Sequence, residues 1–373
     1  MKVALDVSAV PERIAGAGRY IAELATRLPE HEVTTTLVTR RHDDARWRRR
    51  SPSSTIAPIV PDARVARLLY EASRLGSSRA ARSVDVWHGP HYTMPRRSQV
   101  PAVVTIHDLT FFTNPEWHER SKVAFFRRSI AYSAAHASVL VCVSDFTARL
   151  LDEVVSDHAP VVVAPHGVDL ERFAPEGSDD EQRFGSHGLV ADAPYILFVG
   201  TLEPRKGVDV LLDAFSVVAD TDPSIELWLA GQAGWGLRDV EATISSHRAS
   251  SRIRRLGFVD EDVLPALMRR ARAVAYPSKG EGFGLPVLEA MACGATVVTT
   301  SGTVMAEVAG DGALLVPVGD SPALASALAG AVASSDDERS ARSRLARTHA
   351  EQYTWERSMH QHLIAYEMAR RNQ

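Results

Sequence analysis

Short apolar runs alternate with longer stretches of helical periodicity along most of the chain. Because these runs lack polar alternation, they indicate parallel strands that are covered on both faces. Amphipathic stretches lie between them, for example at Tyr20–Leu28 and Ala124–Ala135. This βα repeat predicts a doubly wound sheet. In the first half the predicted strands are Lys2–Val7, Val33–Val38, Val84–His88, Val100–Ile106, Val139–Val143 and Val161–Ala164.

The pattern is interrupted at Ala174–Ala193, a polar stretch rich in Gly and Asp that we interpret as an interdomain linker. It then resumes, so the sequence predicts an α/β protein with two Rossmann-like domains in tandem. The strands of the second half are Tyr195–Val199, Ile225–Ala230, Ile253–Phe258, Ala273–Pro277, Thr296–Thr299 and Leu314–Val316. A final helix is predicted over Thr354–Arg371, with one face formed by Trp355, Met359, Leu363 and Tyr366.

Composition places the chain among ordinary globular proteins, with 45% hydrophobic and 24% charged residues. The net charge of −4 argues against a dedicated nucleic-acid binder. Two cysteines without a CxxC pair indicate neither a zinc site nor a redox pair. The N-terminal apolar stretch is too short for a signal peptide, and no run reaches the ~20 apolar residues that span a bilayer. We therefore expect a cytoplasmic protein.

The segment with the most chemistry runs from Tyr276 to Gly294 and reads YPSKGEGFGLPVLEAMACG. A strand leads into a Gly-rich loop, and a helix begins near Pro286, because proline is tolerated in a first helical turn. The loop glycines let the backbone approach a ligand closely, and the amides at the helix start attract an anion. A phosphate is the natural occupant.

Two carboxylates, Glu281 and Glu289, accompany this predicted phosphate site. Carboxylates beside a phosphate are unfavourable unless each meets a hydrogen-bond donor. Vicinal hydroxyls of a sugar or a ribose are such donors, so the segment suggests a ligand with sugar, phosphate and ribose in a row. The alternative is that Glu289 only favours the helix start while Glu281 is exposed.

This segment resembles the E-x7-E signature of the retaining family 4 glycosyltransferases, which have the GT-B fold. The resemblance extends over nearly the whole chain. It implies that Glu281 contacts hydroxyls of the donor sugar and that Glu289 contacts the ribose. The backbone amides around Phe283, Gly284 and Leu285 would then bind the phosphate.

The same resemblance implies a domain organisation. An acceptor-side domain is expected at residues 1–173 and a nucleotide-sugar-binding domain at 174–352, facing each other across a cleft. A C-terminal helix at 353–373 is expected to pack back on the N-terminal domain. Ligands of open α/β sheets bind at the carboxyl ends of the strands, so we expect the chemistry there.

The turn after the first strand of the second half agrees with the resemblance. It reads GTLEPRKG, begins at Gly200 and Thr201, and is similar to the family's diphosphate-binding turn. We expect Arg205 and Lys206 to neutralise the leaving diphosphate, on which bond cleavage leaves charge. Taken alone, an Arg-Lys pair at a helix start is equally typical of a solvated surface.

Gly16 and Gly18 open the first long helix. The family has a Gly-rich loop here that approaches the donor phosphate or the acceptor, and a plain turn is an equally supported alternative. The dinucleotide-binding fingerprint is not met, because Ile21 stands where its third glycine would be.

His107 and Asp108 follow the strand Val100–Ile106. The resemblance implies that His107 touches the donor sugar at the reaction centre, and Asp108 is expected to orient it or to lie on the acceptor side. His88 and His91, in WHGPHYTMP, are further candidates for the acceptor side. A structural role is as well supported for this last pair.

No metal requirement is expected. The literal DxD match at Asp260 to Asp262 precedes an amphipathic stretch, where acidic residues favour a helix N-terminus, and we interpret it as a helix cap. Arg205, Lys206 and the helix dipole would take the place of a divalent ion on the diphosphate.

The sequence therefore predicts a retaining glycosyltransferase that moves a hexose from a nucleoside diphosphate sugar to an acceptor hydroxyl of a glycan, polysaccharide or glycolipid. The segments TLEPRKG, GQAGWG and YPSKGEGFGLPVLEAMACG look most like bacterial mannosyl- and rhamnosyltransferases. GDP-mannose is favoured over UDP-glucose or dTDP-rhamnose. The alternatives are a nucleotide-sugar epimerase on the same fold and an inactive sugar-nucleotide-binding subunit.

Two basic segments raise the question of membrane contact. They are the cluster Arg46–Arg50 (RWRRR) and Lys122–Tyr132 (KVAFFRRSIAY), in which two phenylalanines precede two arginines. A basic amphipathic helix can lie on anionic lipid, which would place the protein at the inner face of the plasma membrane. A solvated loop and a core-facing helix are the alternatives.

Overall fold

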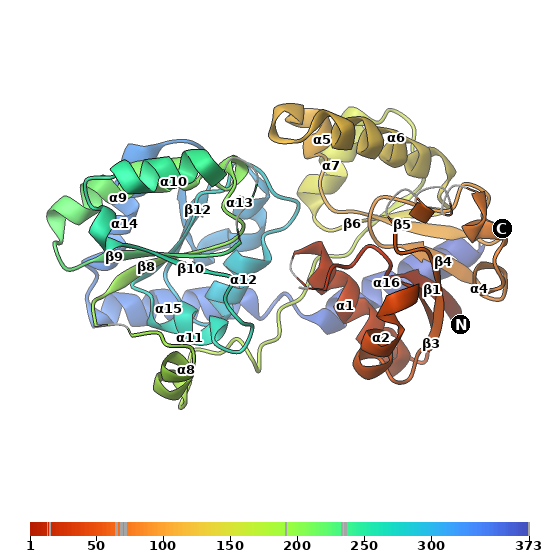
Figure 1. The fold of residues 1–373 in the computed structure, drawn as a ribbon, viewed down its shortest axis with the longest axis horizontal. Helices are drawn as coiled ribbons and strands as arrows, with labels where there is room; N and C mark the ends of the chain where they lie inside the picture. The colour runs from red at the N-terminus through yellow and green to blue at the C-terminus, as the bar shows by residue number, and fades with distance from the viewer. Residues whose placement is uncertain are drawn as a thin grey trace. The chain divides into compact units, whose positions relative to one another are not determined.

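The computed structural model describes residues 1–12, 14, 16–63, 66–67, 70, 73–190, 192–232, 234 and 237–371. The chain divides into two compact units (Figure 1). Unit 1 comprises Met1–Gly167 and Trp355–Gln373, and unit 2 comprises Val168–Thr354. The C-terminal helix therefore belongs to the N-terminal unit, as expected.

Unit 1 is built on a seven-stranded parallel sheet in the order β3-β2-β1-β4-β5-β6-β7. Its central strands β4, β5 and β6 are buried along their whole length, because helices cover both faces. The strands are β1 (Lys2–Asp6), β2 (Thr34–Arg40), β3 (Thr55–Val60), β4 (Val86–Gly89), β5 (Ala102–Ile106), β6 (Val139–Cys142) and β7 (Val161–Val163). The helices are α1 (Ala17–Arg27), α2 (Asp44–Arg50), α4 (Arg79–Arg82), α5 (Thr110–Thr113), α6 (Arg120–His136), α7 (Asp145–Val154) and α16 (Trp355–Arg371).

Strand β3 is the one strand of unit 1 that the apolar pattern did not predict. It reads TIAPIV, and its proline at position 58 removes a backbone donor. Proline is tolerated at the edge of a sheet, and β3 is an edge strand. Pro58 is therefore compatible with a strand at this edge position.

Helix α16 packs against strands β4 to β7 and against α1. Figure 1 shows this blue helix among the red and orange elements of the N-terminal half. Trp355, Met359 and Tyr366 are buried in the same core cluster as β1 and α1, as the periodicity predicted. Leu363 is only partly buried, and His362 is fully buried instead.

Unit 2 carries a six-stranded parallel sheet in the order β10-β9-β8-β11-β12-β13, and each of these strands was predicted. The strands are β8 (Tyr195–Val199), β9 (Glu226–Ala230), β10 (Ile253–Gly257), β11 (Ala273–Tyr276), β12 (Val297–Thr300) and β13 (Leu314–Val316). The helices are α8 (Asp180–Ser186), α9 (Val208–Thr221), α10 (Leu237–Ser246), α11 (Leu264–Arg270), α12 (Leu285–Ala292), α13 (Val304–Ala309), α14 (Ser321–Val332) and α15 (Asp336–Ala350).

The stretch expected to be a linker, residues 174–193, is part of unit 2 and contains helix α8. Phe184 of this helix is buried, and Asp180 pairs with Arg269 of α11. The chain passes between the units at residues 167–168 and again at 354–355. Val168 and Thr354 form a parallel bridge beside these two passages. The first passage lies six residues before the boundary expected at 173.

The two basic segments considered for membrane contact pack partly into unit 1. Trp47 of α2 is fully buried, while Arg48 to Arg50 are exposed. Phe126 of α6 stacks on Phe111, with ring centroids 4.4 Å apart, and the next residue, Arg127, donates to the carbonyls of residues 111 and 112. Among the described residues, no helix combines the length and apolar content needed to cross a bilayer.

Candidate functional site

In unit 2, the connections that follow strands β8 and β11 meet at one edge of the sheet. The two strands are parallel neighbours, so their carboxyl ends lie side by side. A Cβ atom at Gly207 would lie 2.1 Å from the carbonyl oxygen of Pro277, and Gly207 has φ 69°. Only glycine permits this approach of the two connections. They carry Arg205 and Lys206 on one side and Glu281 on the other.

The carboxylate of Glu281 lies at the centre of this edge. Arg205 Nη1 donates to its Oε2 at 2.8 Å, and Lys206 Nζ pairs with its Oε1. Oε1 also accepts from Ser278 Oγ at 2.8 Å and from Tyr276 Oη at 3.1 Å. Four protein donors therefore surround one carboxylate that is only 10% exposed.

The two cations are themselves held in place. Arg205 also donates to the carbonyl of Gly280 at 2.7 Å and to Glu203 at 2.8 Å. Lys206 donates to Tyr276 Oη at 2.9 Å and lies 5.3 Å from the centroid of that ring. The charges of Arg205, Lys206, Glu203 and Glu281 sum to zero, so a bound anion would compete with the carboxylates for the cations.

The ionisation of this cluster follows from burial and charge. Burial raises the pKa of the Glu281 carboxyl, but the charges of Arg205 and Lys206 outweigh it and lower that pKa to about 2. Burial lowers the pKa of Lys206, and Glu281 opposes this shift. Burial also raises the pKa of Tyr276 well above its usual value, so its hydroxyl stays protonated and donates.

Sequence reasoning brought Arg205, Lys206 and Glu281 into one site but missed the donors beside them. It expected sugar hydroxyls to donate to the Glu281 carboxylate, whereas in the structure the chain's own cations and hydroxyls donate to it. Tyr276 and Ser278 lie five and three residues before Glu281, inside the segment already singled out. Two hydroxyl side chains at the end of a strand were the sequence signal that could have identified these donors.

Helix α12 continues this segment. Its N-cap is Gly284, with φ 104°, and a Cβ atom there would lie 2.3 Å from Met305 Cε, so the turn into the helix requires glycine. Pro286 lies in the first turn as predicted, and Leu285 and Phe283 are buried. Three further residues were predicted to contact the sugar donor. Glu289 lies in the second turn of α12 and is 5% exposed. Gly200 follows β8 directly, and the next residue, Thr201, is exposed.

In unit 1, His107 follows strand β5 and is 7% exposed. Its Nε2 lies 2.8 Å from the carbonyl oxygen of Pro90, which can only accept, so Nε2 carries the proton and Nδ1 is the acceptor in the neutral ring. Burial lowers the pKa of His107. Asp108 does not orient this ring, because its carboxylate accepts from Tyr92 Oη at 2.8 Å and from Thr110 N at 3.0 Å.

The two other candidate histidines differ in their surroundings. His88 is fully buried and forms hydrogen bonds with Thr105 and Tyr366. It is therefore a structural residue and does not contact the acceptor substrate. His91 is partly exposed, and its ring centroid lies 5.7 Å from that of His107. Burial lowers the pKa of His91 to about 3, so it is neutral at physiological pH.

The Gly-rich loop of unit 1 is described in part. Gly16 is the N-cap of α1 with φ 51°, and Gly18 is buried in the first turn. Arg13 and Ala15, which precede them, lie outside the described residues.

A chain of hydrogen bonds links Tyr20 of α1 to Thr105 of β5 at 2.8 Å and to His362 of α16 at 2.7 Å. The ring of Tyr20 also meets His107 edge-on, with centroids 5.2 Å apart. Sequence reasoning missed Tyr20, Thr105 and His362, because their proximity depends on where α16 packs.

The acidic segment after β10 does not cap a helix, contrary to our expectation. Helix α11 has Val263 as its N-cap, without a side-chain capping bond and without an acidic residue in its first turn. Asp260 and Asp262 instead face His187.

A hollow of about 680 Å³ lies at the opposite end of the sheet of unit 2, beside the first residues of β8, β11 and β12. Tyr195, Arg269 and Arg344 are among its lining residues, and none of the predicted site residues takes part. Ligands of open α/β sheets bind at the carboxyl ends of the strands, so we place the site at the Glu281 edge.

Known family models match both halves of the chain. Residues 14–172 match the family model described as Glycosyltransferase Family 4, and residues 193–334 match Glycosyl transferases group 1. The chain is 30% identical to the D-inositol 3-phosphate glycosyltransferase of Jonesia denitrificans, over 74% of this chain and 68% of that one. The chain belongs to the family 4 glycosyltransferases.

Further relatives align with this family 4 glycosyltransferase over almost its whole length. The O-antigen chain mannosyltransferase B of Escherichia coli is 29% identical over 99% of this chain and 100% of its own. The sucrose-phosphate synthase structure from Thermosynechococcus elongatus superposes with a TM-score of 0.78 at 20% identity, over 97% and 98% of the chains. The structure of Anabaena HepE in complex with UDP-glucose gives 0.75 at 20% identity, over 95% of each. Both show the GT-B fold.

Proposed function

We propose that this glycosyltransferase moves a hexose, with mannose favoured, from GDP-mannose to an acceptor hydroxyl in glycan, polysaccharide or glycolipid biosynthesis. The observation that carries the proposal is the placement of Arg205 and Lys206 against Glu281 at the carboxyl edge of the unit 2 sheet. The similarity to an O-antigen chain mannosyltransferase over the whole chain supports mannose as the sugar. The HepE complex with UDP-glucose supports a nucleotide sugar as the donor.

In this proposal the cations serve the leaving group. Cleavage of the glycosidic phosphate bond leaves negative charge on the diphosphate, and fixed cations that meet it in a largely buried site lower the barrier. Glu281 holds both cations in position before the donor binds, and it then positions the sugar through its hydroxyls. Transfer proceeds with retention, and a phosphate oxygen helps to take the acceptor proton.

We assign His107 to contact with the donor sugar, on the family resemblance. Its Nδ1 is the acceptor atom of the neutral ring, because Nε2 is tied to Pro90, so it accepts from a sugar hydroxyl and does not donate. Replacing His107 by Ala, which removes both of these bonds, should therefore lower turnover while the protein stays folded.

We further propose that the reaction needs no divalent ion, since Arg205 and Lys206 supply the positive charge. Turnover measured in EDTA should equal turnover in Mg²⁺ or Mn²⁺. A strict dependence on an added ion would contradict this part of the proposal.

The variant Lys206→Ala tests the role of the cations, with Lys279→Ala as the matched control. Lys279 lies two residues from Glu281, but it pairs with the exposed Asp209. Turnover should fall about 10²–10³-fold in Lys206→Ala, the loss typical of removing one group that stabilises transition-state charge. It should change less than about twofold in Lys279→Ala. Near-normal turnover of folded Lys206→Ala would overturn the assignment.

Two measurements address the donor and the stereochemistry. Thermal-shift titration with GDP-mannose, UDP-glucose and dTDP-rhamnose should show the largest stabilisation with GDP-mannose, because a ligand that binds only the folded state raises its melting temperature. Stabilisation by a UDP-sugar alone would refute the preference for mannose. NMR of the product should show the anomeric configuration of the donor, and an inverted product would refute retention.

A further inference from the structure

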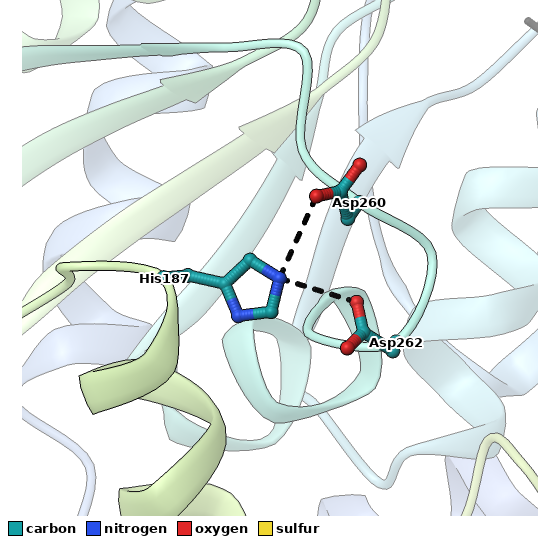
Figure 2. Close-up of side chains that lie close together, drawn as sticks. All are labelled: His187, Asp260 and Asp262. Carbon is teal, nitrogen blue, oxygen red and sulfur yellow. Dashed lines mark ion pairs between the residues drawn. The ribbon is translucent and has the colours of Figure 1, made fainter.

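His187, Asp260 and Asp262 form a cluster that the transfer reaction does not use. His187 follows helix α8, and the two aspartates lie in the turn between β10 and α11. His187 Nε2 lies 3.3 Å from an oxygen of Asp262 and 3.6 Å from an oxygen of Asp260. Figure 2 shows this ring nitrogen facing both carboxylates. The three potential ligand atoms lie within 4.8 Å of one another.

The other ring nitrogen fixes the tautomer. His187 Nδ1 lies 2.9 Å from the carbonyl oxygen of Arg183, which can only accept a hydrogen bond. Nδ1 therefore carries a proton, and in the neutral ring Nε2 presents its lone pair to two anionic oxygens. A lone pair that faces two anionic oxygens is unfavourable, and either a proton on Nε2 or a metal ion between the atoms removes the repulsion. A backbone carbonyl on the far nitrogen is also the usual partner of a metal-bound histidine.

The charges around the cluster leave both aspartates uncompensated. Their neighbour Glu261 pairs with Arg172, and Arg183 pairs with Asp179 on its own helix. In the described parts of the chain, His187 is the one side chain paired with Asp260 and Asp262. With a neutral ring the cluster carries a charge of −2, which one divalent cation neutralises.

Two of the three spacings in the cluster match a specific class of ion. A tetrahedral zinc ion with bonds of about 2.0–2.2 Å holds its ligand atoms roughly 3.3–3.6 Å apart. The two distances from Nε2 fall in that range. One imidazole nitrogen and two carboxylate oxygens suit zinc and, more weakly, manganese or cobalt, whereas calcium takes oxygen ligands.

We propose that His187, Asp260 and Asp262 bind one divalent transition-metal ion, for which Zn²⁺ is the best match, and that this ion fastens α8 to the β10–α11 turn. Arg183 Nη1 already donates to the carbonyl of Asp262 at 2.6 Å, so the two segments are held together before the ion binds. Water completes the coordination, because His187 is 21% exposed and the two aspartates lie at the surface, 68% and 59% exposed. The site is independent of the donor site and of metal-free transfer.

The test is metal titration of the full chain without a polyhistidine tag. Co²⁺ binding is followed by visible absorption and Zn²⁺ binding by calorimetry, for the wild type and the variants His187→Ala and Asp262→Asn. His136→Ala is the matched control, because this exposed histidine makes the same Nδ1 contact to the carbonyl four residues earlier and has no carboxylate partner among the described residues.

The wild type and His136→Ala should bind one equivalent, and the two site variants should bind at least about tenfold more weakly, since loss of an outer-sphere partner alone costs that much. Zn²⁺ should also slow hydrogen exchange in α8 in the wild type but not in His187→Ala. Equal affinity in all four proteins, or no binding by the wild type, would overturn the proposal. A protonated His187 ring whose NMR signals do not respond to Zn²⁺ would show a plain ion pair and would overturn it as well.

Discussion

Tyr20 lies in the middle of a buried hydrogen-bond chain whose direction can be worked out atom by atom. His362 Nδ1 lies 2.7 Å from the carbonyl of Ser358 and must donate to it, so its Nε2 accepts from the Tyr20 hydroxyl. The Tyr20 oxygen then accepts from the Thr105 hydroxyl at 2.8 Å. Each hydroxyl has one proton, so this one sequence of donors is consistent.

The chain continues through His88 to its other end. The Thr105 oxygen accepts from His88 Nε2 at 2.8 Å, and His88 Nδ1 accepts from the Tyr366 hydroxyl at 2.8 Å. Burial keeps His88 neutral by lowering its pKa well below the usual value, and it lowers that of His362 to about 4. Tyr366 is thus a terminal donor, while Tyr20 both donates and accepts.

The variants Tyr20→Phe and Tyr366→Phe should therefore differ in cost. Tyr366→Phe leaves one buried acceptor, His88 Nδ1, without a partner, at about 1–3 kcal/mol. Tyr20→Phe leaves two groups unsatisfied, the Thr105 hydroxyl and His362 Nε2, so it should cost roughly twice as much. Tyr132→Phe is the matched control, because this hydroxyl lies at the surface and bonds to the carbonyl of Arg96. It should change stability by less than about 0.5 kcal/mol.

Native-state hydrogen exchange read by mass spectrometry is the appropriate assay, because the two units need not unfold together. Opening free energies of peptides from α16, β4 and β5 should fall in the two variants, with the larger fall in Tyr20→Phe. Peptides from β8 and β9 of unit 2 serve as the internal reference and should not change. Equal losses for the two variants, or a loss in Tyr132→Phe of the same size, would refute the assigned direction of the chain.

Three further predictions concern charge. The unfolded chain protonates His362 near pH 6.5 and the folded chain only near pH 4. The stability of unit 1 is therefore complete above pH 6.5 and falls towards pH 4, by about 3 kcal/mol from this residue. Opening free energies of α16 that are equal at pH 7 and pH 5, after correction for the slower intrinsic exchange at the lower pH, would contradict this. Glu281→Gln should lower turnover and should destabilise unit 2 by about 1–3 kcal/mol, because it removes the anion between the buried Lys206 and the partly buried Arg205. GDP should raise its melting temperature more than that of the wild type, and an equal GDP shift in both proteins would count against this prediction. The exposed Arg48, Arg49 and Arg50 should give weak binding to anionic liposomes that is lost at high salt, and co-sedimentation of their triple Ala variant at wild-type level would rule this contact out.

Much of the fold could be predicted because its signals are local. An apolar run of four to six residues indicates a buried parallel strand wherever it occurs, and every predicted strand is present. The misses depend on tertiary context instead. Strand β3 contains a proline that only an edge position tolerates, and α8 is a short helix in a polar stretch, held by the burial of Phe184 and the pairing of Asp180 with α11.

The sequence by itself determined the kinds of element, the strand-end positions of His107 and Glu281, and the family to which the chain belongs. Only the tertiary structure decided which side chains meet. Arg205 lies 76 residues from Glu281, and they pair because β8 and β11 are neighbours in the sheet. His88 lies 278 residues from Tyr366, and its structural role depends on the return of α16 to unit 1. Packing between distant segments determines which partners a buried polar group meets. Local periodicity in the sequence therefore cannot predict these partners.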